Sequence, residues 1–479
     1  MISVTISDRA GANGASTDTR PGWLDGAEDP QSLHAAHINP RFAKVLQLIG
    51  FDRTWVRAEG AALFDDQGER YIDLLAGYGV FNMGRNHPRI RDALIDYLQS
   101  KDASLVQLGT SRLAGLLAGR LKTLVGGRLE RVHFTSSGHE GIETAIKFAR
   151  RATGRPVILY AKAAFHGLST GALALNGTNL FKDGFGPLLP DCGAIPFDDL
   201  AALEAALGKG DVAAFVVEPI QGKRVGIPAP GYLCEAARLC RRHGALFVAD
   251  EVQTGLGRTG RMFAYQHDGD VDPDIVVIAK SLSGGFVPVG AVLYPKWVYD
   301  KVFCSLERAV VHSSTFGQGG LAMAAGLAAL DVIEDEDLAG RAAALGDRLG
   351  NGLLALKERH EFLVDVRWRG LMLGLEFGPP RALSLKAGWA LAHKLDQSLF
   401  CQALIIPLFS RHHILTQVAG PAVDIIKLIP PLVISEADID RVVQAFDEVL
   451  ADLHQFPGPA WTTLASIGRN AARHAFDPA

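Results

Sequence analysis

The sequence predicts an α/β protein whose mostly parallel sheet is covered by helices on both faces, together with a smaller α+β lobe. Three observations predict this class. Short apolar runs rich in β-branched residues alternate with helical patterns through the centre of the chain. The chain has 479 residues, 48% of them hydrophobic, which is enough for two or three compact lobes. After about residue 335, long helices and a few strands replace the alternating pattern.

The first two predicted segments are an arm and part of the small lobe. Residues 1–35 are rich in Gly, Ala, Ser, Asp and Pro without clear periodicity, which predicts a loosely ordered arm. Short strands are expected at 55–57, 62–64 and 71–74, joined by an Asp/Gly turn. Because of these strands, we assign residues 36–95 to the N-terminal segment of the small lobe.

Residues 96–335 form the predicted large domain. Helix 231–243 is a good example of its helical patterns, because Gly244 follows where a left-handed cap is favoured. The strands of this domain are expected at 132–134, 157–160, 214–217, 246–249 and 275–279.

Residues 336–456 are predicted to complete the small lobe, and residues 457–479 form a tail without an interpretable pattern. The expected elements are a long helix through Leu356, strands at 363–366, 371–377 and 425–429, and helices at 385–400 and 436–453.

Composition excludes several classes of function. With 48 basic and 52 acidic residues, the formal charge of -4 provides no positive field to hold a polyanion, so nucleic acid is not an expected partner. The five cysteines include no C-x-x-C pair, which argues against a disulfide framework and a zinc knuckle, and no metal site is predicted. Neither an apolar leader nor a membrane-length apolar run is present, so we expect a cytoplasmic protein without membrane contact.

Three charged residues stand at or just after apolar runs. Glu218, Asp250 and Lys280 are separated by about one strand plus one crossover each. In a parallel sheet such residues meet at the carboxyl edge, where α/β folds place their sites. Strands also end in charged residues simply because they reach the surface, and only the joint spacing favours a shared cleft.

A helix is expected to begin just after the strand at 132–134. Ser137 and Glu140 have the spacing of a capping box, and apolar residues follow at helical intervals. The free N–H groups at such a helix start suit a phosphate, although an ordinary capped helix has the same local pattern. In contrast, the G-x-G-x-x-G match at 255–260 is rejected as a dinucleotide site, because residues 261–274 are too broken by Gly, Asp and Pro to form the required helix.

Residues 40–450 resemble the class III pyridoxal-phosphate aminotransferases of fold type I, which include ornithine, acetylornithine, 4-aminobutyrate and amine transaminases. The resemblance implies an α/β large domain built on a seven-stranded, mostly parallel sheet. It depends on motifs that occur in order, at 84–88 (GRNHP), 137–140 (SGHE), 165–167 (FHG), 218–222 (EPIQG), 250–255 (DEVQTG), 279–281 (AKS), 314–317 (STFG) and 430–432 (PPL).

The resemblance implies roles for the cofactor, pyridoxal 5′-phosphate. Lys280 would hold it as a Schiff base and then move the substrate proton, while Asp250 would pair with the pyridine nitrogen. The other cofactor contacts implied are Ser137, Gly138, His139, Phe165, His166, Glu218, Val252, Gln253 and, from the neighbouring subunit, Thr315. A homodimer with two shared active sites is therefore expected. Phe165 and Val252, taken without their motifs, have the residue types of ordinary core positions.

Departures from the ornithine-type pattern bear on the substrate. Leu168 and Lys427 stand where members that handle ornithine-like substrates carry Arg, and Lys holds a carboxylate less specifically than the planar, two-pronged Arg. Lys223 and Trp368 suggest a remodelled channel. With Tyr78 and Phe81 expected near the channel mouth, the substrate contacts predict an amine without an adjacent carboxylate and a 2-oxo acid, aldehyde or ketone partner.

Other functions stay open at this point. Arg367, Arg411 or Lys427 could bind a carboxylate in a shifted position, as an ornithine- or acetylornithine-type enzyme requires. Aminomutases and decarboxylases are a second enzyme class on this fold, and a non-catalytic relative is a third hypothesis. A scaffold needs none of Lys280, Asp250 and Gln253, which argues against the third.

Overall fold

The computed structural model describes residues 29–395, 399–421, 423–455, 458 and 461. Most of the predicted arm and most of the predicted tail therefore lie outside the described residues. Helix α1 (Pro30–His37) begins within the last residues assigned to the arm, with the Asp29 side chain accepting a hydrogen bond from the Ser32 backbone. Among the described residues, none of the helices is both long enough and apolar enough to span a bilayer.

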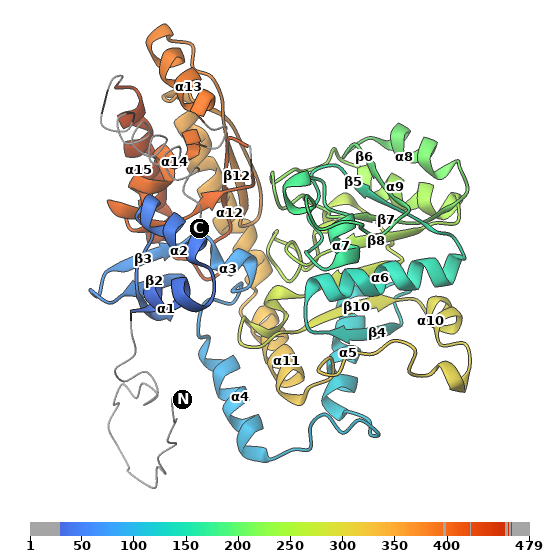
Figure 1. Ribbon diagram of the computed structural model, residues 1–479. Helices are drawn as coiled ribbons and strands as arrows, with labels where there is room; N and C mark the ends of the chain where they lie inside the picture. The colour runs from blue at the N-terminus through green and yellow to red at the C-terminus, as the bar shows by residue number, and fades with distance from the viewer. Residues whose placement is uncertain (1–28, 396–398, 422, 456–457, 459–460, 462–479) are drawn as a thin grey trace, which may run out of the picture.

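A seven-stranded sheet forms the centre of the large domain (Figure 1). The neighbouring strands β9, β8, β7, β5 and β6 are parallel, whereas β10 runs antiparallel to both β4 and β9. In spatial order the strands are β4 (Arg131–Thr135), β10 (Gly290–Tyr294), β9 (Ile275–Ile278), β8 (Leu246–Asp250), β7 (Val212–Val217), β5 (Val157–Ala161) and β6 (Cys192–Ile195).

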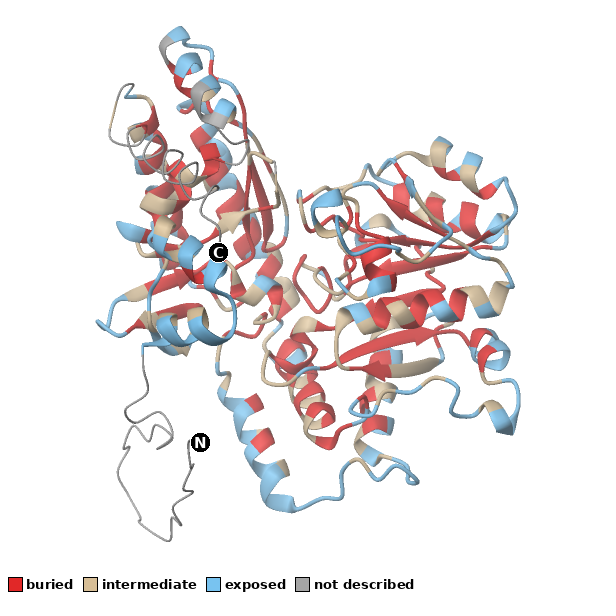
Figure 2. Cartoon of the chain, in the orientation of Figure 1, coloured by how far each residue is buried: buried red, intermediate tan, exposed pale blue. Residues whose placement is uncertain are grey.

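Alternate residues of the central strands face two separate apolar clusters. Val216 and Val248 pack in the cluster that contains Phe148 of helix α6 (Gly138–Thr153), while Phe215 and Phe247 belong to the larger cluster on the other face. Because both faces are covered, every residue of β7 and β8 is buried, as the red strands of Figure 2 show. The other helices of this domain are α5 (Arg112–Val125), α7 (Thr170–Ala174), α8 (Leu200–Leu207), α9 (Tyr232–Arg242), α10 (Lys296–Val302) and α11 (Gly320–Asp335).

Segments from both ends of the chain form the smaller part of the molecule. Strand β3 (Arg70–Asp73) pairs in parallel with β13 (Ile414–Leu415), so the N-terminal hairpin and a C-terminal segment share one sheet. A second sheet has the order β11-β12-β15-β14. The remaining elements are α2 (Pro40–Ile49), β1 (Trp55–Glu59), β2 (Ala62–Asp65), α3 (Ala76–Gly79), β11 (Leu363–Arg369), β12 (Met372–Phe377), β14 (Gln417–Val418), β15 (Ile425–Leu428), α12 (Leu338–Ala355) and α15 (Glu436–Leu453).

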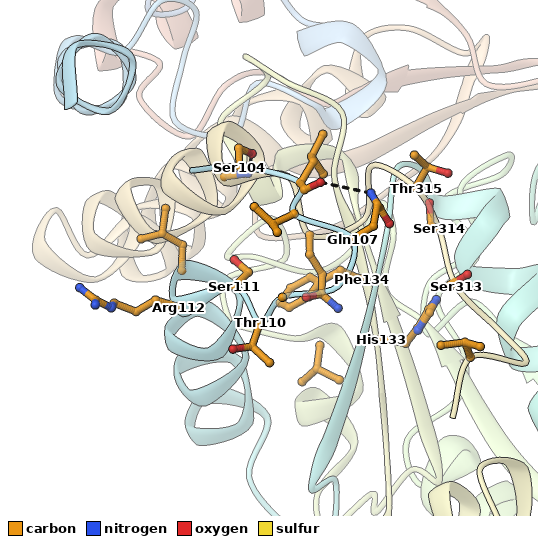
Figure 3. Close-up of a pocket in the computed structure, with 18 of the residues that line it drawn as sticks. Ser104, Gln107, Thr110, Ser111, Arg112, His133, Phe134, Ser313, Ser314 and Thr315 are labelled. Carbon is orange, nitrogen blue, oxygen red and sulfur yellow. Dashed lines mark hydrogen bonds between the residues drawn. The ribbon is translucent and has the colours of Figure 1, made fainter. Parts of the chain in front are cut away.

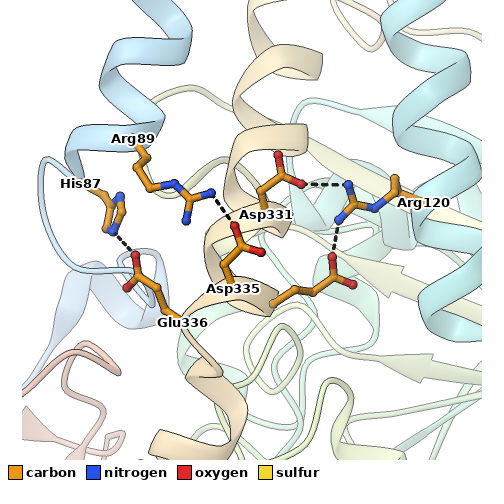
Figure 4. A network of polar contacts seen from close by, with 7 residues as sticks. His87, Arg89, Arg120, Asp331, Asp335 and Glu336 are labelled. Atoms are coloured by element: carbon orange, nitrogen blue, oxygen red, sulfur yellow. Dashed lines mark hydrogen bonds and ion pairs between the residues drawn. The ribbon is translucent and has the colours of Figure 1, made fainter.

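Ion pairs connect two helices to the C-terminal part of α11 (Figure 4). Arg89 of α4 (Pro88–Ser100) pairs with Asp335 at 2.6 Å, and His87 lies 3.2 Å from Glu336. Arg120 of α5 contacts Asp331 at 2.8 Å and also Glu334. These exposed pairs add little free energy individually, but they orient α4 and α5 against the same helix.

The predicted helix at 385–400 is wrong in its extent. The structure has α13 (Leu383–Leu395) followed by α14 (Leu399–Ser410), which contains Pro407. The sequence of α14 is almost wholly apolar and most of its residues are buried, so packing compensates for the hydrogen bond that Pro407 removes. The rejected G-x-G-x-x-G segment forms turns, and a short 3₁₀ helix at Ala264–Asp268 follows it, so the rejection is confirmed.

Candidate active site

Three neighbouring parallel strands deliver the charged residues that the sequence singled out. Asp250 ends β8, Glu218 follows β7 and Lys280 lies two residues beyond β9. The register pairs β7 with β8 and β8 with β9 in parallel, so all three residues lie at the carboxyl edge of one sheet. Lys280 has φ of 45°, a left-handed conformation that is rare for a side chain of its size and common at functional sites.

The Asp250 carboxylate is buried and held at both oxygens. One oxygen lies 2.7 Å from His166 Nδ1, and the other accepts a 3.1 Å hydrogen bond from the Val252 backbone. Burial alone would lower the pKa of His166, but the hydrogen bond and the charge of Asp250 outweigh burial and raise it. Nε2 of His166 is buried and has no hydrogen-bond partner among the described residues. His166 was predicted as a cofactor contact, and the structure shows that it contacts Asp250.

A buried amide positions this histidine. Asn176 accepts a hydrogen bond from the His166 backbone N–H at 3.0 Å and donates one to the Gly167 carbonyl at 2.8 Å. Sequence reasoning missed Asn176. Its one local signal is a polar residue at the end of the apolar run 171–175, which is weak because such residues also end helices.

Glu218 holds two loops in place with its two oxygens. One accepts from the Phe165 backbone N–H at 3.0 Å, and the other from the Gly222 backbone N–H at 2.8 Å. Burial raises the pKa of Glu218. Its observed contacts are therefore with backbone groups of the chain, and they place Phe165 and Gly222 beside the same carboxylate.

Lys280 and Lys427 bring two amines into this low-dielectric region. Burial lowers the pKa of Lys280, and the charges of Asp250 and Glu218 oppose that shift. Burial and the nearby charge of Lys280 lower the pKa of Lys427 to about 7. A lowered pKa favours the neutral amine, the state in which a lysine can act as a nucleophile or accept a proton.

The helix that follows β4 begins as the sequence predicts. Ser137 is the N-cap of α6, and its hydroxyl accepts from the Glu140 backbone at 3.3 Å. The Glu140 carboxylate accepts from the Ser136 backbone at 2.7 Å, so the capping box closes one residue earlier than expected. A Cβ at Gly138 would lie 2.7 Å from Val252 Cγ1, so only glycine lets the helix start approach this residue.

Three distant parts of the chain meet at Gln253. Its Nε2 donates to the Tyr78 carbonyl at 2.9 Å, while Lys427 Nζ lies 3.4 Å from its Oε1. Lys427 also donates to the Gly222 carbonyl at 2.9 Å. This edge of the sheet therefore brings together residues from the N-terminal segment, the large domain and β15.

Other residues predicted to contact substrate lie around this edge. The side chains of Tyr78 and Leu168 are exposed, and the Phe81 ring lies under the Arg85 guanidinium at 4.2 Å. The suggestion that Trp368 remodels the channel is wrong. Its ring packs against Gly350 of α12, and its Nε1 donates to Asp347 at 2.9 Å.

Two of the three cations considered for a carboxylate already have acidic partners. Arg367 pairs with Asp365 at 2.8 Å and Glu376 at 2.6 Å, and Arg411 pairs with Asp452 at 2.7 Å. Lys427 is the cation of the three that lies at the cleft.

Thr315 lines a cavity that is separate from the region around Asp250 and Lys280. A cavity of about 750 Å³ is lined by residues 102–107 and 109–113, by part of β4 and by the segment that includes Ser313, Ser314 and Thr315 (Figure 3). Neither Lys280 nor Asp250 lines it. Thr315 is exposed in this wall.

These contacts fit pyridoxal 5′-phosphate. The first N–H groups of α6 have no partner within the helix and suit a phosphate. The close approach of Gly138 to Val252, which a Cβ would prevent, brings that helix start next to the loop after Asp250. A buried carboxylate fixed by His166 suits a protonated ring nitrogen, and Lys280 extends from the neighbouring strand.

Comparison with known proteins gives one family. The Aminotransferase class-III family matches residues 50–450. The aminotransferase PigE from Serratia sp. is 36% identical over 461 residues, which are 90% of this chain and 54% of that protein. The chain thus spans about half the length of this curated relative.

Solved structures agree in fold. The ornithine aminotransferase from Toxoplasma gondii ME49 is 31% identical with a TM-score of 0.74, covering 84% of this chain and 90% of that one. A PLP-bound amine transaminase from an uncultivated Pseudomonas species is 28% identical with a TM-score of 0.73, covering 83% and 94%. The chain belongs to the class III aminotransferases, which have fold type I and use pyridoxal 5′-phosphate.

Proposed function

We propose that this chain is an aminotransferase that moves an amino group from an amine without a carboxylate beside its reacting carbon to a 2-oxo acid, aldehyde or ketone. The observation that carries the proposal is the convergence of Lys280 with the His166–Asp250 pair at one sheet edge. A protein without catalytic function has no need to bury a lysine beside two carboxylates.

The proposed attachment point of the cofactor is Lys280 Nζ. When bound, pyridoxal phosphate supplies an electron sink for the negative charge left on the substrate carbon. Lys280 Nζ would take the proton from that carbon and return it on the other side of the transfer, and burial, which lowers the pKa of this amine, favours the neutral form that accepts a proton. Asp250, fixed by His166, would keep a proton on the ring nitrogen.

We propose the remaining cofactor contacts from the positions of the residues in the structure. Ser137, Gly138 and His139 at the start of α6 would hold the phosphate. Phe165 and Val252 would enclose the ring and exclude water, and Gln253 would direct its amide to the phenolic oxygen. Support comes from Glu218, which fixes the Phe165 backbone, and from Gly138, which contacts Val252.

The substrate class is supported by the residues that stand in place of arginine near this edge of the sheet. Leu168 offers no hydrogen bond to a carboxylate, and Lys427 is bound to the Gly222 carbonyl with its pKa lowered to about 7. Arg367 and Arg411 have acidic partners elsewhere. An amine with an apolar substituent at its reacting carbon meets no penalty for unpaired charge here.

We also propose a homodimer with shared sites. The segment around Thr315 carries exposed apolar side chains, among them Val310 and Phe316, and Leu108 is fully exposed near the same cavity. Exposed apolar side chains that lie on neighbouring segments are suited to a protein interface. In such a dimer, Thr315 would serve the partner's phosphate.

The test is a donor screen on the holoenzyme. Each amine alone should convert the cofactor to its pyridoxamine form, and a carbonyl compound should then restore the original spectrum. Aryl-alkyl and long-chain amines are expected to react faster than ornithine, acetylornithine and glutamate. A much higher second-order rate for ornithine or acetylornithine would contradict the argument from Leu168 and Lys427, and conversion of one substrate without a stable pyridoxamine form would indicate an aminomutase or decarboxylase.

A further inference from the structure

We propose that Lys223 selects substrates by the charge that they carry beyond the reacting carbon, accepting neutral or anionic groups there and rejecting a second ammonium. This inference rests on the proposed aminotransferase function and adds a specificity residue to it. It concerns the distal part of the substrate, whereas Leu168 and Lys427 bear on a carboxylate beside the reactive amine.

Two aromatic rings and one hydroxyl hold the Lys223 ammonium. Nζ lies 5.1 Å from the centroid of Phe165 and 4.5 Å from that of Phe181, and these two rings meet edge-on with centroids 5.6 Å apart. Nζ also donates to Thr178 Oγ1 at 3.1 Å. Aromatic faces stabilise a cation without neutralising it, so the positive charge at this place remains available to a ligand.

The Lys223 ammonium makes no ion pair with an acidic side chain among the described residues. Within the described part of the chain, no carboxylate oxygen lies within 4.0 Å of Lys223 Nζ. Glu218 is the acid whose charge acts on Lys223, but both of its oxygens are occupied by the backbone N–H groups of Phe165 and Gly222. The two oxygens of Asp250 are likewise engaged.

Further basic groups surround the same place. The Lys427 ammonium donates to the Gly222 carbonyl, one residue before Lys223, and the charges of Lys280 and Arg258 both act on Lys427. Lys223 is only partly buried, and burial lowers its pKa while Glu218 opposes the shift. A partly desolvated group of cations attracts an anion and repels another cation more strongly than exposed lysines do.

The position of Lys223 links this charge to the reaction. Phe165, whose ring contacts the Lys223 ammonium, precedes His166 in the chain, and His166 holds Asp250. A substrate that reacts beside Phe165 therefore extends past a fixed positive charge. Interaction of one unit charge at a partly buried site of this kind changes a rate or affinity on the order of tenfold.

The experiment compares three amines that share a six-carbon chain and differ in its far end. The probes are hexylamine, hexamethylenediamine and ε-aminocaproate, each assayed for the single-turnover half-reaction of the holoenzyme at fixed ionic strength. In the unaltered protein, ε-aminocaproate and hexylamine should react faster than hexamethylenediamine by about tenfold or more. Lys223→Met should remove this discrimination, Lys223→Glu should invert it, and Lys223→Arg should retain it.

Lys296→Met is the control, because Lys296 lies in α10 and its Nζ pairs with Asp300 of the same helix. Lys182 is unsuitable, since its charge acts on Lys223. An equal loss of discrimination in Lys296→Met, or unchanged ratios in Lys223→Met and Lys223→Glu, would overturn the proposal. Hexanoate provides a readout independent of turnover: calorimetry should show weaker binding to Lys223→Met holoenzyme than to the unaltered protein, and equal binding contradicts the inference. Failure of all amines to react with the unaltered holoenzyme would instead count against the aminotransferase function.

Discussion

Nδ1 of His166 lies 2.7 Å from a carboxylate oxygen of Asp250, although 84 residues separate the two in the chain. Both side chains are buried, and the pair stands at the carboxyl end of β8. The hydrogen bond and the charge of Asp250 outweigh burial and raise the pKa of His166, so the pairing favours the charged imidazole ring.

Replacement of His166 should slow turnover without preventing cofactor binding. His166→Ala leaves Asp250 with one hydrogen bond, so we expect kcat to fall on the order of tenfold to a hundredfold. The pH dependence of the bound cofactor's absorbance should shift as well, since the charge opposite Asp250 is lost. His166→Gln, which can still donate a hydrogen bond, should recover part of the rate; an unchanged pH profile in both variants would rule out this positioning role.

Lys280→Ala should abolish covalent attachment of the cofactor. The unaltered protein should be yellow, and borohydride should fix the cofactor to a peptide that contains Lys280. We expect turnover to fall on the order of ten-thousandfold, since both the attachment and the proton transfer are lost. Mass spectrometry of the reduced, digested protein checks the assignment, and a label on any other lysine contradicts it.

Asp250→Asn should bind cofactor but react slowly. The amide has nearly the same shape as the carboxylate but no charge, so it cannot keep the ring nitrogen protonated. We expect the half-reaction rate to fall at least about a hundredfold at saturating cofactor. Asp268→Asn is a suitable control, because Asp268 caps the start of α9 away from the cleft. A wild-type half-reaction rate in Asp250→Asn would show that Asp250 does not keep the ring nitrogen protonated.

Lys427→Met should raise the free energy of unfolding in a pH-dependent way. Lys427 has a folded-state pKa lowered from 10.5 to about 7, so the unfolded chain binds more protons between these values and stability rises with pH there. The cost of burying the charged lysine is complete below about pH 7 and absent above about pH 10.5. The gain from methionine should therefore be largest in acid and vanish in base. Urea unfolding of the apoprotein across this window measures it, and a gain that is constant with pH would be inconsistent with a buried, titrating Lys427.

Two inactive variants should restore activity when they are mixed. If Thr315 serves the partner's site, a heterodimer of Lys280→Ala and Thr315→Glu subunits contains one site with both residues intact. Random mixing after reversible dissociation should recover about a quarter of the wild-type activity. Sedimentation should find the activity with the dimer. No recovery despite heterodimer formation would place Thr315 outside the partner's site.

The sequence by itself determined the sheet edge and the residues on it. Strands β7 and β8 are buried on both faces, so their apolar runs are continuous, and the charged residues that end them mark the carboxyl edge. The spacing of Glu218, Asp250 and Lys280 then follows from the length of a strand and its crossover. Ser137 and Gly138 were predictable for the same local reason, because a helix start has a pattern of its own.

Only the tertiary structure decided which side chains meet across this edge. The contacts of Asp250 with His166, of Glu218 with the Phe165 and Gly222 backbones, and of Lys223 with Phe181 join residues whose separation along the chain has no period. Trp368 is the opposite case. It was expected in the substrate channel because of its place after Arg367 in the chain, but its side chain packs toward α12. Periodic patterns report which face of a strand or helix is buried, whereas these contacts depend on the distances between packed elements, which the local sequence does not specify.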